Sequence, residues 1–138
     1  MAESCTGGLI SHLITNVPGS SDYFVLGTVT YSNNAKMRIL GVSKIILESF
    51  GAVSSECARA MAEGVKNVGR SDLGLAVTGI AGPGGGSPAK PVGLVFIGLA
   101  TEKTTSVKEF RFTGSRLEIK EQTARSALEM VWGHLKTL

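Results

Sequence analysis

Two uncharged apolar runs flank a glycine-rich loop near the middle of the chain, and this stretch constrains the fold most. The runs span residues 73–78 and 92–100 and are rich in Val, Leu and Ile, which is typical of strands covered on both faces. Such a loop can turn several backbone N–H groups toward one point and suits an anion or a nucleotide. The alternative is a long hairpin connection between the two strands that needs glycine only for its turns. The loop glycines are Gly79, Gly82, Gly84, Gly85 and Gly86.

Two familiar glycine motifs are excluded by what surrounds this loop. A P-loop needs Lys followed by Ser or Thr and then a helix, whereas Lys90 is followed by Pro91 and a predicted strand. A dinucleotide-binding fingerprint also opens a helix, and this loop leads into the second apolar run instead. If the loop binds a ligand, it therefore does so in another way.

Hydrophobic periodicity and helix-boundary residues predict the remaining elements. Ser32 or Asn33 is expected to cap a short helix that ends at Gly41. The mixed order of elements predicts an α/β (α+β layered) single domain over residues 1–138, with a mixed sheet and helices on its faces. The last strands are expected to be antiparallel neighbours because short loops join them. We expect helices over residues 6–16, 33–40, 44–50 and 57–68, strands over residues 23–31 and 104–112, and a last helix beginning at residues 114–116.

Charge and cysteine content argue against several classes of protein. The net charge is only +3 and the basic residues are scattered, so nucleic-acid binding is not indicated. No apolar run is long enough to span a membrane. Cys5 and Cys57 form neither a metal-binding spacing nor a disulfide framework, which predicts a reducing cytoplasm. A positive mean hydropathy in so small a domain favours a homo-oligomer, in which a partner covers some apolar surface.

Ser4 is a candidate nucleophile because it lies immediately before a predicted helix. The free N–H groups at a helix start can stabilise a developing oxyanion. Cys5 is the rival nucleophile, since a helix start lowers a thiol pKa. A simple capping role for Ser4 or Thr6 is the alternative. Neither histidine, His12 or His134, is an obvious partner for these groups.

A serine without a histidine partner needs another base, and lysine is the usual one. Lys36 is expected near the start of the second helix, at its third position if Asn33 is the cap. The partial positive charge there would lower the lysine pKa toward the range of a general base. Tyr31, at the end of the preceding strand, could relay the proton or orient the nucleophile. A solvated surface lysine is the alternative.

Seven blocks of the sequence together resemble one known family. Because they occur in family order across nearly the whole chain, and no single common motif would produce them, the resemblance to the CinA C-terminal domain family is highly specific. It implies an amidohydrolase that converts nicotinamide mononucleotide to nicotinate mononucleotide and ammonia, within pyridine nucleotide salvage. It implies neither a metal nor another cofactor. The blocks span residues 2–8, 29–36, 40–42, 51–54, 78–86, 90–95 and 114–116.

The resemblance also assigns roles by position. It implies Ser4 as the nucleophile, with Tyr31 and Lys36 as its activating partners. Arg116, in the Gly-Ser-Arg turn, is the candidate for holding the 5′-phosphate. The remaining expected substrate-binding residues come from the blocks at residues 2–8 and 78–86: Glu3, Thr6, Gly7, Gly8, Thr78, Gly79, Gly82, Gly84 and Gly85.

One feature departs from the family pattern. Members usually carry a helix and a strand before the Ala-Glu-Ser-Cys block, and the nucleophile of such folds sits at the end of that strand, whereas only Met1 precedes the block here. We therefore expect less support for Ser4 on that side. This departure leaves an inactive nucleotide-binding or interaction module as the alternative function, and a hydrolase for another amide as a third possibility.

Overall fold

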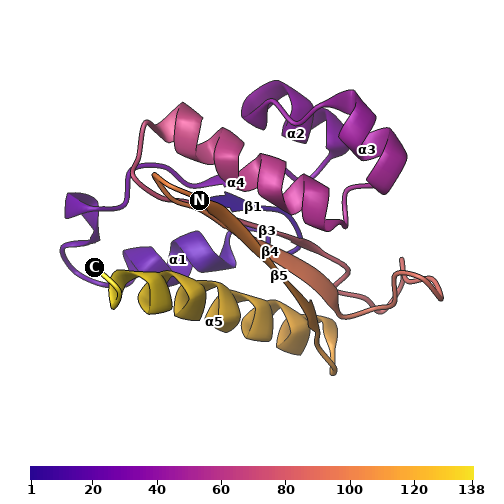
Figure 1. Cartoon of the computed structure of the whole chain (residues 1–138). Helices are drawn as coiled ribbons and strands as arrows, with labels where there is room; N and C mark the ends of the chain where they lie inside the picture. The colour runs from indigo at the N-terminus through magenta and orange to yellow at the C-terminus, as the bar shows by residue number, and fades with distance from the viewer.

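A computed structural model describes residues 1–138 and contains one five-stranded mixed sheet with helices on both faces (Figure 1). The strand order is β2-β1-β3-β4-β5. The first three strands in this order run parallel, and β4 and β5 are each antiparallel to their neighbours. The layered fold class and the antiparallel last strands are confirmed. The strands are β1 (Ala2–Glu3), β2 (Thr28–Val29), β3 (Gly74–Gly79), β4 (Leu94–Ala100) and β5 (Thr105–Arg111).

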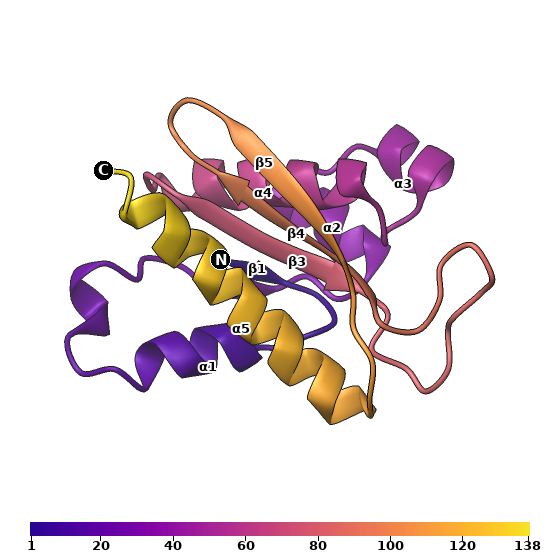
Figure 2. The same cartoon turned by 60° about the horizontal axis from the view of Figure 1, so that its bottom comes forward.

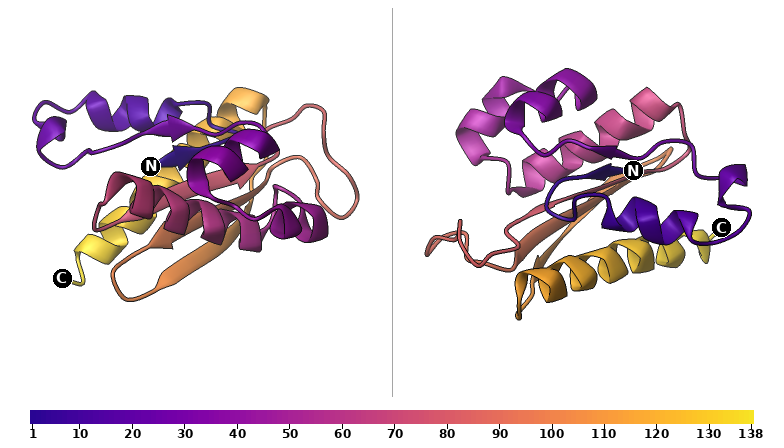
Figure 3. Two further views of the ribbon diagram at one scale, coloured as in Figure 1. Left: turned by 90° about the horizontal axis from the view of Figure 1, so that it is seen from above. Right: turned by 180° about the vertical axis from the view of Figure 1, so that it is seen from behind.

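The helices form two layers around the sheet. Helices α1 (Leu9–Thr15) and α5 (Arg116–Leu135) lie side by side on one face (Figure 2). Helix α4 (Ser55–Gly69) covers β3, β4 and β5 on the other face. Helices α2 (Asn33–Leu40) and α3 (Lys44–Phe50) pack against α4, as both views of Figure 3 show.

Small residues on one face of the sheet let α4 approach closely. Leu75 and Val77 of β3 belong to the apolar core beneath α5, whereas Ala76 between them belongs to the core beneath α4. At Gly74 an added Cβ would lie only 2.1 Å from the backbone carbonyl oxygen of Ala62 in α4. Glycine in a strand interior usually weakens the strand. Gly74 is required here because the α4 backbone packs directly against it.

The strand expected over residues 23–31 is mostly wrong. A short 3-10 helix, Ser20–Asp22, precedes this segment, and only Thr28–Val29 pair as a strand. The physical reason is the length of the neighbouring strand. β2 pairs with β1 alone, in the register Ala2 with Thr28 and Glu3 with Val29, so the rest of the segment has no ladder partner.

The start of the chain also differs from the sequence expectation. Residues 2 and 3 form a strand between β2 and β3, so Ser4 does follow a strand end. The expected helix over residues 6–16 begins only at Leu9, because Gly7 and Gly8 adopt positive φ values of 60° and 105°. Residues 4–8 are therefore a turn, closed by a hydrogen bond from the Gly7 N–H to the Ser4 carbonyl.

The other expected elements are confirmed to within two residues, and the largest differences are the start of β4, at Leu94 instead of residue 92, and the start of α4, at Ser55 instead of residue 57. Ser32, one of the two candidate caps, accepts a hydrogen bond from the Ala35 N–H, so Lys36 is the fourth residue of α2 and not the third. None of the helices combines the length and the apolar character that crossing a membrane requires.

We predict opposite effects for two glycine-to-alanine substitutions. Gly74→Ala should lower the free energy of unfolding by about 1–3 kcal/mol because its Cβ collides with the α4 backbone. Gly133→Ala, exposed on α5 with no atom near the new Cβ, should raise it by about 0.5–1 kcal/mol. Urea unfolding measures both, and equal effects would contradict the close approach of α4.

Candidate active site

The predicted catalytic residues meet at the carboxyl ends of the three parallel strands. Ser4 directly follows β1, Lys36 lies on the helix after β2, and Thr78 is near the end of β3. The chain leaves β1 toward α1 on one face and leaves β2 toward α2, α3 and α4 on the other. This is a topological switch point, where open α/β sheets form their ligand crevices.

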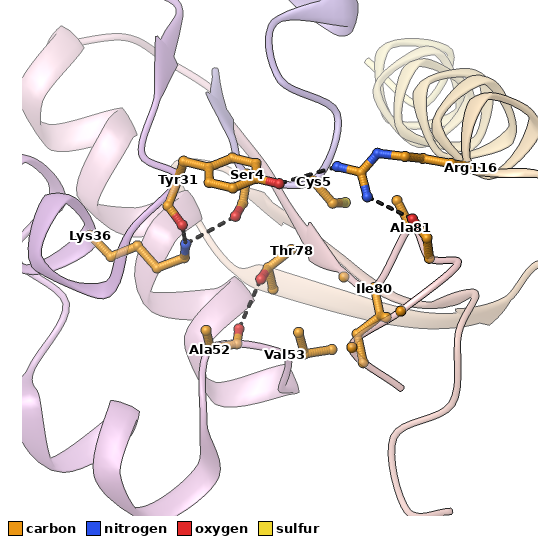
Figure 4. Close-up of a pocket in the computed structure, with 14 residues that line it drawn as sticks. Ser4, Cys5, Tyr31, Lys36, Ala52, Val53, Thr78, Ile80, Ala81 and Arg116 are labelled. Atoms are coloured by element: carbon orange, nitrogen blue, oxygen red, sulfur yellow. Dashed lines mark hydrogen bonds between the residues drawn. The ribbon is translucent and has the colours of Figure 1, made fainter. Parts of the chain in front are cut away.

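A cleft of about 270 Å³ opens at this point. Figure 4 shows side chains from the turn after β1, from α2 and from α5 arranged around it. Among the predicted residues it brings together Ser4, Tyr31, Lys36, Thr78, Arg116 and four of the loop glycines. The lining residues are Ser4, Cys5, Tyr31, Lys36, Ala52, Val53, Thr78, Gly79, Ile80, Ala81, Gly82, Gly84, Gly85 and Arg116.

Lys36 contacts Ser4 directly. Its Nζ lies 3.0 Å from the Ser4 Oγ and donates to the backbone carbonyl of Tyr31 at 3.0 Å (Figure 4). It also donates to the backbone carbonyl of Thr30 at 2.8 Å. The lysine side chain is only 1% exposed and Ser4 is 8% exposed. This geometry answers a question that the sequence left open, since it is Lys36 and not the Tyr31 hydroxyl that touches the serine.

Burial lowers the pKa of the Lys36 amine. No carboxylate pairs with this amine, because the ion pairs of the chain join Lys44 to Glu48 and Arg111 to Glu109. The direction agrees with the sequence expectation, but the cause is desolvation by the surrounding protein and not the helix N-terminus. A neutral amine has two N–H groups and one lone pair. In this neutral form the two carbonyls would accept from the N–H groups, and the lone pair would face the Ser4 hydroxyl.

Cys5 lies in the same cleft but is poorly suited to attack. Burial raises the pKa of its thiol to about 11, so the thiol stays protonated at neutral pH. The thiolate, and not the thiol, is the nucleophilic form of cysteine. The Lys36 amine also makes its side-chain hydrogen bond to Ser4 and not to Cys5. Both observations favour Ser4 over its neighbour.

Tyr31 takes part through two different groups. Its backbone carbonyl accepts a hydrogen bond from Lys36. Its ring is largely exposed, and its hydroxyl accepts a hydrogen bond of 3.2 Å from the Arg116 guanidinium (Figure 4). The hydroxyl makes no hydrogen bond to Ser4 or Lys36 in this structure, so the predicted proton relay through Tyr31 is not assembled here.

Glu3, Thr6, Gly7 and Gly8 lie outside the cleft, and the structure gives Glu3 another role. Its carboxylate is fully buried and accepts hydrogen bonds of 2.7–2.9 Å from the Thr6 hydroxyl, the Ile10 N–H, and the N–H and hydroxyl of Ser11. These donors include the free N–H groups at the start of α1, which a carboxylate stabilises well. The acid thus fixes the turn that carries Ser4 and has no exposed surface for a substrate.

The glycine loop supplies the other wall of the cleft. Its backbone N–H groups at residues 81, 82 and 84–86 donate no hydrogen bond within the chain. Arg116 holds the loop through a 2.7 Å hydrogen bond from Nη1 to the Gly82 carbonyl, and Thr78 Oγ1 donates to the Ala52 carbonyl. Ala81, Gly82, Gly84 and Gly85 line the cleft, so their unused N–H groups are candidates for the donors that the sequence predicted for an anion.

Sequence reasoning missed the apolar lining residues Ala52 and Val53, and named only the glycines of the loop that also contributes Ile80 and Ala81. All four fall inside blocks that carried the family resemblance, which was the available signal. The basic lining residues are Lys36 and Arg116, and no carboxylate lines the cleft. The cleft therefore suits a ligand that combines an apolar portion with an anionic group.

Comparisons with known proteins agree with this architecture. The family model of the CinA C-terminal domain matches residues 1–135. A CinA-like protein of Geobacter sulfurreducens is 56% identical over 137 residues, which are 99% of this chain and 33% of that protein. The chain spans about a third of the length of the curated relatives that it matches.

Solved structures are similar over nearly the whole chain. The competence/damage inducible protein CihA from Agrobacterium tumefaciens has a TM-score of 0.94 and 47% identity, with 96% of this chain and 81% of that chain covered. The competence damage-inducible protein A from Klebsiella pneumoniae has a TM-score of 0.94 and 31% identity, with 98% and 84% covered. The chain belongs to the CinA C-terminal domain family.

We predict that Glu3 stabilises the fold because its carboxylate accepts four buried hydrogen bonds. Glu3→Gln replaces one acceptor oxygen by an amide that faces donors, and should lower the free energy of unfolding by about 1.5–3 kcal/mol. The exposed Glu63→Gln on α4 is the control and should change it by less than about 0.5 kcal/mol. Similar small changes in both variants, measured by urea unfolding, would show that the carboxylate is dispensable.

Proposed function

We propose that this domain hydrolyses the carboxamide of nicotinamide mononucleotide, giving nicotinate mononucleotide and ammonia, with Ser4 as the nucleophile. The observation that carries the chemistry is the buried Lys36 amine 3.0 Å from the Ser4 Oγ. The substrate assignment follows from the family resemblance. It is supported by a cleft that pairs apolar walls with a cationic end. The chain is a domain of the CinA family.

The first half of the reaction transfers the acyl group to the serine. The Ser4 Oγ attacks the carboxamide carbon while the neutral Lys36 amine accepts the hydroxyl proton. The resulting ammonium donates to the carbonyls of Thr30 and Tyr31. The tetrahedral oxyanion is stabilised by backbone N–H groups of the glycine loop, such as those of Ala81 and Gly82, which have no partner in the chain.

The second half regenerates the enzyme. The Lys36 ammonium returns its proton to the leaving nitrogen, so ammonia departs and an acyl ester remains on Ser4. A water molecule then attacks this ester, with Lys36 again accepting a proton, and the carboxylate product leaves as the serine hydroxyl is restored. One water is consumed, one ammonia is released, and the product carboxyl loses one proton to the ammonia or the solvent as it ionises, so the balance needs no other co-reactant.

The two ends of the substrate are placed by different walls of the cleft. The apolar side chains of Val53 and Ile80 suit the pyridine ring, and Arg116 at the start of α5 suits the phosphate. Arg116 presents five N–H donors, and the hydrogen bonds to the Gly82 carbonyl and the Tyr31 hydroxyl use two of them. Donors therefore remain for a phosphate.

The nucleophile is tested by ammonia release from nicotinamide mononucleotide. Ser4→Ala should lower turnover by more than about a thousandfold, since it removes the attacking atom. Cys5→Ala should keep turnover within about fivefold, because the thiol is protonated and does not attack. Loss of turnover in Cys5→Ala alone would assign the reaction to the cysteine, and an inactive parent chain would favour the nucleotide-binding module.

The base is tested by the pH dependence of kcat/KM. Only the neutral Lys36 amine accepts a proton, so kcat/KM should rise with pH through the lowered pKa of this lysine and fall tenfold per pH unit below it. Lys36→Met should abolish turnover, whereas Lys44→Met, at an exposed lysine on α3, should leave the profile unchanged. A profile that is flat from pH 5 to 9 would remove Lys36 from the mechanism.

A further inference from the structure

One side chain, Lys90, joins the glycine loop to the segment that follows α3. Its Nζ donates a hydrogen bond of 2.5 Å to the carbonyl of Phe50, the last residue of α3. The same ammonium lies 2.9 Å from the position that a Cβ on Gly51 would occupy. Carbonyls at a helix C-terminus lack intrahelical partners and carry partial negative charge, so they attract a cation. Lys90 has no role in the proposed reaction, although it opens one of the sequence blocks that carried the family resemblance.

The Phe50 carbonyl lies at the start of one wall of the cleft. Ala52 and Val53, just after it in the chain, line the cleft. The Ala52 carbonyl accepts a hydrogen bond of 2.9 Å from the Thr78 Oγ1, which fixes this wall to β3 (Figure 4). Lys90 therefore attaches the glycine loop to a segment that is itself fixed to the sheet.

The half of the glycine loop that lines the cleft packs against the half that carries Lys90. An added Cβ would lie 2.4 Å from the Val92 Cγ1 at Gly82, and 2.8 Å from the Val92 nitrogen at Gly86. A turn closes the loop, since the Ser87 N–H donates to the Lys90 carbonyl at 2.8 Å and the Lys90 N–H donates to the Ser87 Oγ at 3.1 Å. A displacement of Lys90 is thus passed to the residues of the loop that line the cleft.

Few contacts hold this loop in place. It projects beyond the end of the sheet, and residues 83–89 are exposed (Figure 2). Side-chain hydrogen bonds tie it to the rest of the molecule at two points, from Arg116 to the Gly82 carbonyl and from Lys90 to the Phe50 carbonyl. Arg116 comes from α5, so Lys90 alone joins the loop to the wall at residues 51–53.

We propose that Lys90 is a positioning residue that holds the glycine loop and residues 51–53 at the separation that the pyridine ring needs. This inference rests on the proposed function, in which Val53 and Ile80, one from each of these segments, contact the ring. Without the Lys90–Phe50 hydrogen bond, arrangements with the loop displaced become more populated. The affinity for a ligand falls in proportion to the population that can bind it. Lys90 does not line the cleft, so the loss is the same for every ligand that carries the ring.

The Lys90–Phe50 contact is tested first without a ligand. Spin labels at Gly84→Cys, where an added Cβ meets open space, and at Ile45→Cys, exposed on α3, report the distance between the loop and α3. Both native cysteines are replaced by alanine in this background. The distance distribution from pulsed electron paramagnetic resonance should broaden in Lys90→Met. It should stay as in the parent in Lys103→Met, in the exposed turn after β4. Identical distributions in the parent and Lys90→Met would overturn the inference.

Ligand binding then tests the effect on the cleft. In a Ser4→Ala background, which prevents turnover, calorimetry gives the Kd of nicotinamide mononucleotide and of nicotinamide riboside. Lys90→Met should weaken both by the same factor, about fivefold or more, the scale of one hydrogen bond. Lys90→Arg should restore most of the affinity because it keeps the charge and the donors, and Lys103→Met should change neither Kd. An unchanged Kd for both ligands in Lys90→Met would overturn the inference. A loss confined to the mononucleotide would also overturn it, because Lys90 would then contact the phosphate directly.

Ammonia release by the chain with Ser4 intact separates this inference from the proposed function. A loop position that depends on Lys90, in a chain that releases no ammonia, would support the Lys90–Phe50 contact and contradict the amidohydrolase. Ammonia release with mononucleotide and riboside affinities that ignore Lys90 would support the amidohydrolase and contradict the positioning role of Lys90.

Discussion

The burial of the Lys36 amine is the constraint on which the site depends. An unpaired ammonium is costly to bury, and no carboxylate compensates it here. The surrounding structure instead offers two backbone carbonyls and one serine hydroxyl. Burial favours the neutral amine, and in that form the two N–H groups meet the carbonyls while the lone pair faces the hydroxyl. In the proposed mechanism, the same contact that accommodates the lysine prepares Ser4 for nucleophilic attack.

The fold supplies this contact through the short strand β1. With only two residues, Ala2 and Glu3, it pairs with β2 on one side and β3 on the other. Glu3 then holds the start of α1 with its buried carboxylate, which fixes the turn between them. Because the chain leaves β1 and β2 toward opposite faces of the sheet, the ends of the three parallel strands remain open to a ligand.

Much of this arrangement is predictable from sequence, and the exceptions have physical causes. The long apolar runs predict β3 and β4. The resemblance to the family predicts that Ser4, Lys36 and Arg116 belong to one site. The strand predicted at β2 is too long, because strand propensity does not reveal that β2 pairs with a strand of only two residues. It also assigned Glu3 to the substrate, because an acid next to a nucleophile looks the same whether it faces a ligand or a helix start. The Tyr31–Arg116 contact joins residues 85 positions apart and leaves no local pattern.

The central claim is that Lys36 is a desolvated amine poised to accept the Ser4 proton. NMR titration of the chain with carbon-13-labelled lysines observes this group directly, and Lys36→Met identifies its resonance. The account predicts that one lysine titrates well below the usual value of about 10.4, that this resonance is absent in Lys36→Met, and that its midpoint shifts in Ser4→Ala. If every lysine titrates near the usual value, Lys36 is an ammonium at neutral pH and the proposed base is wrong.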